Sequence, residues 1–517
     1  MKKYTALLLL VLIVQSSCKK FLEVESLHRI SGNNYWKSKA DVEAFTVDLY
    51  AKFRNKLTQT SFIPATGDLR TGYIKFTSTV NANTVGEVSR RIVYDYIARN
   101  DLKRVVGNYV WNTDLTSGGI FYPSMKFNSI TVWTEFYQVI QGANILIDQI
   151  EKGVPGLSPA DEGQYRGEAA FIRSLAYFMM VRIYGDVPYY TEPYIKDAMG
   201  RENMVSVVNK CIADVEKYKE SLPVAYGDPA FRAVRATKGA ALTLQMHMNM
   251  WNAGFDKAKA AAYYSAAADL GQKLLDLKAY ELIPISSFSA VMLGRSPEGI
   301  FEFNQSINYE PQPNPIAFFG EMVLKFPNKG PGSDNNSSHA YIKPAYLSKI
   351  YGTGVDLRKD LWFNSQTMLA GSGSFEFLKF KGDIVSGATG LYGVPEWGLI
   401  IFRYADALLL RAEALAELNK DTEALEMLNM VRARAGAGSA SETGQQLKDV
   451  IFMERNRELL GDGCLYFDLI RTGRILDSQW TDNPLTQAQF NDGGWTWPID
   501  NGALLNNPLM KLNSYWQ

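Results

Sequence analysis

Paired carboxylates are the side chains of this sequence that would most readily support catalysis, because two of them placed across a glycosidic bond are enough to hydrolyse it. The chain carries 54 Asp and Glu residues, so number alone permits such a pair. The acids in the most pronounced motifs nevertheless lie within helical apolar patterns, at Glu168, Glu413, Glu454 and Glu458. Arg455 and Arg457 are interleaved with the last two, which predicts a helix-stabilising network of ion pairs. We therefore expect no enzymatic activity, and a glycan hydrolase is the least favoured alternative.

Metal-binding and nucleophile motifs give no further sign of an active centre. His28, His247 and His339 share no spacing that would place two of them on one metal ion, so we expect structural or surface roles. The sequence contains no G-x-S-x-G, phosphate-loop, H-E-x-x-H or C-x-x-C motif. Residues 332–339 ("GSDNNSSH") offer oxygen ligands but lack the spacing of a calcium loop. We expect neither a metal nor another cofactor.

Two stretches without helical periodicity, residues 60–125 and 285–395, carry side chains that suit a binding surface. A sugar presents C–H groups on a ring face, which aromatic rings cover, and hydroxyls at its rim, which amide and guanidinium groups bind. Candidates of these types are Arg70, Tyr73, Tyr94, Tyr96, Trp111 and Tyr122 in the first stretch, and Asn304, Tyr309 and Trp362 in the second. For any single ring, packing inside the protein is the alternative. Trp133 and Trp251 lie on helical apolar stripes and are assigned to the core.

The N-terminal segment "LLLLVLIVQSSCKK" (residues 7–20) predicts export and lipid attachment. Its unbroken apolar run, residues 6–14, would extend about 14 Å as a helix, far less than the ~30 Å of a bilayer core. A basic start and the small pair Ser16-Ser17 before Cys18 are typical of a lipoprotein signal peptide. We expect a signal at residues 1–17, acylation of Cys18 and a tether at 18–38. An ordinary secretory signal is the alternative.

Composition narrows the class of protein further. The chain has 517 residues, 46% of them hydrophobic, and equal numbers of basic and acidic residues, 54 of each, which argues against a nucleic-acid partner. Cys211 and Cys464 fall in apolar helical patterns and are expected to be buried thiols rather than a disulfide. Nothing in the middle of the chain has the composition of a linker, so we expect residues 39–517 to form one domain.

The predicted architecture is mostly α-helical. Helical periodicity covers residues 39–57, 131–184, 203–277, 403–435 and 446–460, with Gly153 and Gly185 as predicted helix ends and Asp421 as a predicted N-cap. The pairs at about 131–184, 203–277 and 403–435 resemble tetratricopeptide units, whose small residues let antiparallel helices approach closely. The irregular stretches would then be long insertions, with short strands in "GIFEFNQS" and "FEFLKFKG".

The order of these motifs resembles one family along nearly the whole chain, the SusD/RagB family of outer-membrane lipoproteins. The matching stretches are "SCKKFLEVES", "GDLRTG", "YRGEAAFIRSLAYFMMVRIYGDVPYY", "ATKGAAL", "PEGIFEFNQS", "IFRYADALLLRAEALAEL", "LNMVRARAG", "ERNRELLGDGCLYFDLIRTGRI" and "WPIDNGALLNNPLMKLNSYW". A departure lies directly after Cys18, where Lys19-Lys20 replaces an acidic pair.

The resemblance implies a fold in which tetratricopeptide-like pairs support an irregular ligand-binding face. It implies an oligosaccharide ligand, or a peptide as in some members, and a SusC-like TonB-dependent transporter as partner. It also places the protein on the outer membrane, lipid-anchored and exposed at the cell surface. The sugar platform of the family is drawn from the same two irregular stretches, which makes Arg70, Trp111 and Tyr309 the foremost candidates. An envelope adaptor built on tetratricopeptide pairs is a further alternative.

Overall fold

The computed structural model describes residues 35–58, 63–76, 95–103, 128–305, 318–331, 336–364, 368, 375–382, 384–387, 390–393, 397–505 and 507–517. The secondary structure in these ranges is mostly helical, which confirms the predicted fold class. No helix within them combines the length and the apolar character needed to cross a bilayer.

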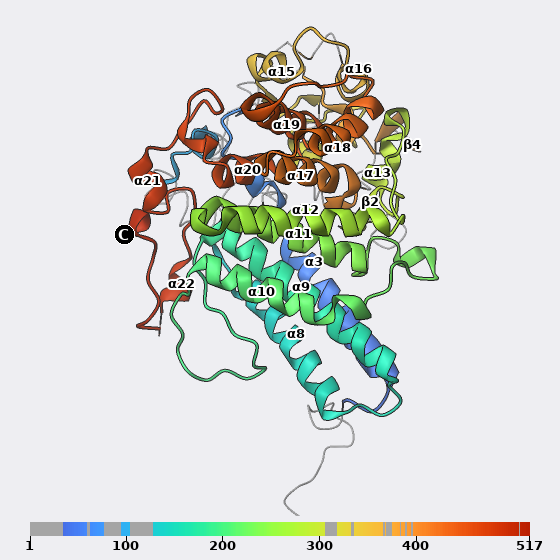
Figure 1. The fold of residues 1–517 in the computed structure, drawn as a ribbon, viewed down its shortest axis with the longest axis vertical. Coiled ribbons are helices and arrows are strands. Elements are labelled where there is room, and N and C mark those ends of the chain that lie inside the picture. Colours follow the sequence, from blue (N-terminus) through green and yellow to red (C-terminus); the bar gives the residue numbers. More distant parts are fainter. Residues whose placement is uncertain are drawn as a thin grey trace, which may run out of the picture.

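Paired helices stacked on one another form the body of the molecule (Figure 1). The long helices, in chain order, are α3 (Lys39–Thr58), α8 (Thr134–Lys152), α9 (Pro159–Tyr184), α10 (Met204–Tyr218), α11 (Lys238–Phe255), α12 (Ala260–Asp276), α17 (Tyr404–Glu417), α18 (Asp421–Arg434) and α19 (Gly444–Glu458). Each helix contacts the next one in the order α8, α9, α10, α11, α12 and α17. Helix α17 then contacts both α18 and α19. The predicted pairs at about 131–184 and 403–435 are present as α8 with α9 and as α17 with α18, whereas 203–277 holds three helices, α10, α11 and α12. These helices stack in sequence order although long segments separate them.

The helix boundaries follow local signals closely. Ser158 caps α9 with a capping box in which its side chain accepts from the Asp161 amide, and Pro159 occupies the first turn. Helices α8 and α9 end at Gly153 and Gly185, as predicted. The prediction for Asp421 was wrong: Lys420 is the N-cap of α18, and the Asp421 carboxylate instead accepts a hydrogen bond from the Gly444 amide.

Short elements join and cover the stack. They are α7 (Asn128–Thr131), α13 (Ser289–Leu293), α14 (Phe318–Met322), α15 (Pro344–Tyr351), α16 (Leu357–Trp362), α20 (Leu465–Arg471), α21 (Gln487–Asn491) and α22 (Asn501–Leu504). The strands pair antiparallel as β1 (Ile74–Phe76) with β3 (Ala340–Ile342), β2 (Gly299–Phe303) with β6 (Leu399–Arg403), and β4 (Ile384–Gly387) with β5 (Gly390–Gly393). The strand predicted in "GIFEFNQS" is thus confirmed as β2.

The strand predicted in "FEFLKFKG" was wrong. Phe377 makes one isolated bridge to Phe363, and the chain then turns into a 3₁₀ helix at Leu378–Phe380. The reason is Lys379, whose ammonium lies inside the protein and donates to Asp462 and to the carbonyls of Glu458 and Leu460. A buried lysine must find such acceptors, and no regular strand would bring it to them.

The residues that helical periodicity assigned to the core are Trp133, Trp251, Cys211 and Cys464. The prediction is confirmed for both tryptophans and for Cys211. Trp133 is 5% exposed and Trp251 1% exposed. Cys211 is buried and Cys464 partly buried, and both are free thiols. Burial raises the pKa of each, which leaves both as unreactive thiols.

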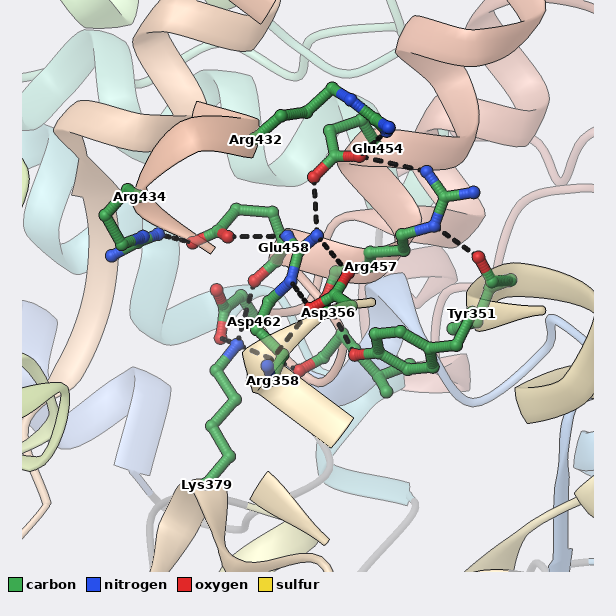
Figure 2. Close-up of polar contacts among 12 residues, drawn as sticks. Tyr351, Asp356, Arg358, Lys379, Arg432, Arg434, Glu454, Arg457, Glu458 and Asp462 are labelled. Carbon is green, nitrogen blue, oxygen red and sulfur yellow. Dashed lines mark hydrogen bonds and ion pairs between the residues drawn. The ribbon is translucent and has the colours of Figure 1, made fainter. Parts of the chain in front are cut away.

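A network of buried ion pairs fastens the second irregular stretch to the C-terminal helices (Figure 2). Its centre is Glu458 on α19, which accepts from Arg358 of α16 at 2.8 Å, from Arg403 of β6 at 2.6 Å and from Arg434 of α18. Burial alone would raise the pKa of Glu458, but Arg434, Arg403 and Arg358 together hold it well below its ordinary value. One carboxylate therefore joins three elements that are far apart in the sequence.

The acids and cations around Glu458 extend the network in both directions. One turn earlier on α19, Glu454 pairs with Arg358 at 2.7 Å and with Arg432 and Arg457 at 2.9 Å each. On the other side, Arg403 also pairs with Glu298 and Asp462, each at 2.9 Å, and Lys379 pairs with Asp462 at 2.7 Å. The predicted network is confirmed for Arg457, and its partners reach far beyond one helix.

Arg455 behaves differently from the prediction. Its guanidinium points away from Glu454 and Glu458 and bonds Asp406 of α17 at 2.9 Å and Asp468 of α20 at 2.8 Å. The two arginines of "ERNRE" therefore serve opposite sides of α19, as residues two apart on a helix must.

Replacing Glu458 by glutamine is expected to destabilise the fold strongly, because three buried guanidinium groups would face a neutral amide. Breaking a buried charge cluster of this kind lowers the free energy of unfolding by about 3–5 kcal/mol. Guanidinium titration followed by far-UV circular dichroism measures the loss. The matched control is Glu423→Gln, which removes a carboxylate half-exposed on α18. A Glu458→Gln variant as stable as that control would contradict the central role of this carboxylate.

Candidate functional site

Arg70, the foremost candidate from "GDLRTG", lies inside the protein and is 1% exposed. Its guanidinium donates to Asn100 Oδ1 at 2.7 Å and to the main-chain carbonyls of Gly494, Trp495 and Thr496 at 2.6–2.9 Å. The ring of Tyr466 packs against it, 4.9 Å from the guanidinium carbon. Arg70 therefore ties the start of the first irregular stretch to the C-terminal segment, a positioning role with no donor left at the surface.

Tyr73, from the same motif, is also buried, at 2% exposure. Its ring stacks on Tyr346 with centroids 4.6 Å apart, and its hydroxyl donates to Asp68 Oδ1 at 2.9 Å. Asp68 Oδ2 accepts in turn from the Gly463 amide at 2.8 Å, and burial raises the pKa of this carboxyl to about 7. Two quoted motifs, "GDLRTG" and "GDG", thus meet at this carboxylate.

Backbone packing explains why both motifs begin and end with glycine at this junction. A Cβ added to Gly67 would lie 1.7 Å from the Gly463 carbonyl oxygen, so no other residue fits without moving the chain. Residues 63–76 are thus bound to the C-terminal part of the chain through Asp68 and Arg70, and we call this segment the Arg70 clamp.

The remaining predicted residues divide into two groups. Tyr94, Trp111, Tyr122 and Tyr309 lie outside the described residues, as does Cys18. Among the described ones, Asn304 is half-buried after β2, Tyr96 is half-buried and Trp362 is buried at 2% exposure. Of the two described candidates in the second stretch, Asn304 lies near the surface and Trp362 does not.

Helix α3 holds the residues that flank the two irregular stretches. Lys56 donates to the carbonyls of Ser129 and Val132 at 3.2 and 2.7 Å, and Arg54 donates to the Asn304 carbonyl at 3.2 Å. The rings of Phe76 and Phe318 lie 6.3 Å apart. The chain therefore leaves and re-enters the helical body at neighbouring points, which is the arrangement expected of a binding surface built from insertions.

An open cavity of about 480 Å³, which we call the α11 cavity, lies where residues 224–237, 278–281 and 296–300 meet. Its lining side chains include Tyr226, Arg232, Thr237, Lys278, Tyr280 and Glu281. Sequence reasoning missed it, because its residues come from loops between helices that carry no chemical motif. The one available signal was the run "VAYGDPAFR", where a tyrosine and an arginine stand among turn-forming residues.

Both tyrosine rings of the α11 cavity are held in place. The Tyr226 hydroxyl donates to the Ala236 carbonyl at 2.9 Å, and the Tyr280 hydroxyl lies 3.0 Å from Thr237 Oγ1. Thr237 is itself the N-cap of α11 and accepts from the Ala240 amide. The rings are therefore rigid parts of the wall.

Glu302 of β2 lies next to two residues of the cavity wall, Ala233 and Gly299. Its amide donates to the Ala233 carbonyl at 2.8 Å, and its Oε1 accepts from the Arg295 amide. Within the described part of the chain, Oε2 is buried without a hydrogen-bond partner. Burial raises the pKa of Glu302 to about 7. A buried carboxyl with so little compensation keeps its proton to a higher pH than an exposed one.

The prominent acids are bound in structural pairs rather than held ready for catalysis. Glu168 bonds Arg235 at 2.8 Å and the Tyr50 hydroxyl at 2.8 Å, and Glu413 bonds Arg471. His247 lies 2.7 Å from Asp406, as expected of a structural histidine, whereas His28 lies outside the described residues. No cluster of metal-ligating side chains occurs in the ranges that the structure describes.

Comparison with known proteins places the chain in a family. A model of the SusD family matches residues 395–516, and one described as "Starch-binding associating with outer membrane" matches residues 75–246. A SusD homolog of Bacteroides thetaiotaomicron has a crystal structure 35% identical in sequence, with a TM-score of 0.79 over 93% of this chain and 99% of that one. The chain belongs to the SusD/RagB family.

Two more distant relatives cover the chain just as fully. SusD-like protein P38 of Formosa agariphila is 25% identical over 99% of both chains. A laminarin-binding SusD-like protein is 19% identical, with a TM-score of 0.68 over 92% of this chain and 99% of that one, and shows that the fold is shared.

Replacing Arg70 by alanine is expected to lower the free energy of unfolding by about 3–5 kcal/mol, because three buried carbonyls and Asn100 would lose their donor. Urea unfolding measures the loss, with Arg99→Ala, at an exposed arginine on the same stretch, as the matched control. A variant that unfolds like the control but loses ligand binding would instead make Arg70 a ligand contact.

Replacing Glu302 by glutamine is expected to change how stability depends on pH. The folded protein holds this proton to about pH 7 and the unfolded chain to about 4.5, so wild-type stability falls as pH rises through that window. Glutamine keeps an oxygen for the Arg295 amide but carries no charge. Between pH 5 and pH 8, the free energy of unfolding of Glu302→Gln should therefore rise relative to that of the wild type by on the order of 3 kcal/mol.

Denaturant unfolding at both pH values measures this shift, and Glu151→Gln, at an exposed acid of α8, is the control. Asp68 is present in both proteins, so its own titration cancels. A difference between wild type and Glu302→Gln that stays constant with pH would show that Glu302 is ionised throughout.

Proposed function

We propose that this protein is an outer-membrane surface lipoprotein that binds oligosaccharide nutrients and delivers them to a SusC-like TonB-dependent transporter. The carrying observation is its membership of the SusD/RagB family over nearly its full length. The family-model description "Starch-binding associating with outer membrane" supports the ligand class and the location, and the laminarin-binding relative supports the ligand class.

The proposed ligand platform is the face from which the two irregular stretches emerge. Trp111, Tyr94, Tyr122 and Tyr309 are its proposed stacking rings, with Asn304 as a hydrogen-bonding group at its edge. The structure supports this position indirectly, because α3 and the Arg70 clamp fix the points where these stretches join the body. A stacking ring that loses about 100 Å² of apolar area contributes roughly 2.5 kcal/mol, so a few rings give weak capture suited to hand-over.

A binding role is also consistent with the prominent acidic residues, because these already form ion pairs that hold the fold together. Hydrolysis needs two carboxylates free to face a substrate. Glu168, Glu413, Glu454 and Glu458 instead bond arginines inside the protein. The lipid on Cys18 would hold this binding body at the membrane, since several acyl chains anchor far more firmly than one.

A glycan panel tests the proposal through affinity electrophoresis and reducing-sugar release in parallel. We expect retardation by at least one neutral polysaccharide, no release of reducing ends, and at least tenfold weaker binding by Trp111→Ala. Tyr194→Ala, at a ring 62% exposed on another loop, is the matched control. Binding of peptides alone, binding of nothing, or release of sugars would each overturn the assignment. Palmitate labelling lost in Cys18→Ser tests the anchor.

A further inference from the structure

We propose that the α11 cavity is a second binding site, separate from the irregular stretches, for a small acidic saccharide unit that carries a carboxylate or a sulfate. The inference rests on the proposed function, because it assigns a ligand of the same general class to a different place. Its volume of about 480 Å³ lies within the 300–1,000 Å³ typical of ligand pockets.

Two cations at the cavity are unpaired within the described part of the chain. Arg232 and Lys278 line it with exposed side chains, and within the described ranges neither has an ion pair or a side-chain hydrogen bond. Arg295, also exposed, precedes the wall residue Ser296. Glu281 is the acidic residue of the lining. The charge balance therefore favours an anion, and a guanidinium matches the paired oxygens of a carboxylate or sulfate.

The aromatic part of the wall fits a saccharide rather than a bare anion. Arg235 covers Tyr226 at 5.3 Å from the ring centroid, and Tyr404 packs against Tyr280 with centroids 6.3 Å apart. Phe231 also packs edge-on against Tyr226, so each ring is held by neighbouring residues and lines the cavity with part of its surface. Because the hydroxyls are already bonded to Ala236 and Thr237, the rings offer C–H contact at little ordering cost.

The backbone of the cavity is strained at three places. Ala233, Lys278 and Arg295 have φ angles of 60°, 51° and 55°, a left-handed conformation that residues other than glycine seldom adopt. Glu302 maintains two of them through its bonds to the Ala233 carbonyl and the Arg295 amide. Strained backbone of this kind is often found at ligand-binding sites, and here it lies in the cavity wall or next to it.

Titration calorimetry of the full chain with D-glucuronate, glucose 6-sulfate, D-glucose and sodium sulfate tests the inference. We expect both acidic sugars to bind at least tenfold more tightly than glucose and than sulfate alone, and binding to weaken between 50 and 500 mM NaCl. The double variant Arg232→Gln/Lys278→Gln should lose at least tenfold in affinity. Arg99→Gln/Lys152→Gln, at exposed cations elsewhere, should lose nothing.

A neutral oligosaccharide that the protein binds is measured in the same series to separate this inference from the proposed function. Trp111→Ala should weaken that ligand and spare glucuronate, and the Arg232/Lys278 double variant should do the reverse. Equal binding of glucose and glucuronate, tight binding of sulfate alone, or an unchanged double variant would overturn the second site. The proposed function would still be tested separately, by the binding of the neutral oligosaccharide.

Discussion

Burial of charge between α19 and the second irregular stretch is the constraint on which this structure depends. Glu458 faces three guanidinium groups, and Glu454 also faces three, one of which, that of Arg358, it shares with Glu458. The arginines from outside α19 come from α16, β6 and α18. Once buried, none of these groups can lose its partner without leaving a bare charge in a poor solvent. A long, irregular part of the chain is thereby joined to a stack of helices through buried ion pairs.

The same burial of charge bears on which side chains are available to contact a ligand. Carboxylates that a sequence reader would examine for acid–base chemistry are bonded to arginine within the body, and Arg70, which looks like a ligand contact, holds three carbonyls of the C-terminal segment. Such internal pairing leaves contact with ligands to other groups, among which we propose Arg232 and Lys278 at the α11 cavity.

Local signals predicted most helices well, but they did not reveal that Arg70 and Tyr73 are buried. The apolar spacing in α8 and α9 and the signals at Ser158, Gly153 and Gly185 act over a few residues, so they are legible in one sequence. The burial of Arg70 was not foreseen, and neither was that of Lys379 in the predicted strand "FEFLKFKG", because arginine and lysine are usually exposed. The acceptors that make their burial possible lie hundreds or tens of residues away. Arg455 was paired with its helix neighbours for the same reason.

The sequence by itself determined the helical class, the stacked pairs and the family, since each rests on periodicity or on motifs that are contiguous along the chain. Tertiary structure alone decided which charges meet. It closed "GDLRTG" on "GDG", turned "FEFLKFKG" inward, and brought three loops from separate regions around the α11 cavity. The physical reason is range: helix formation is settled between residues three or four apart, whereas a buried charge is stabilised by whatever partner the whole fold delivers to it.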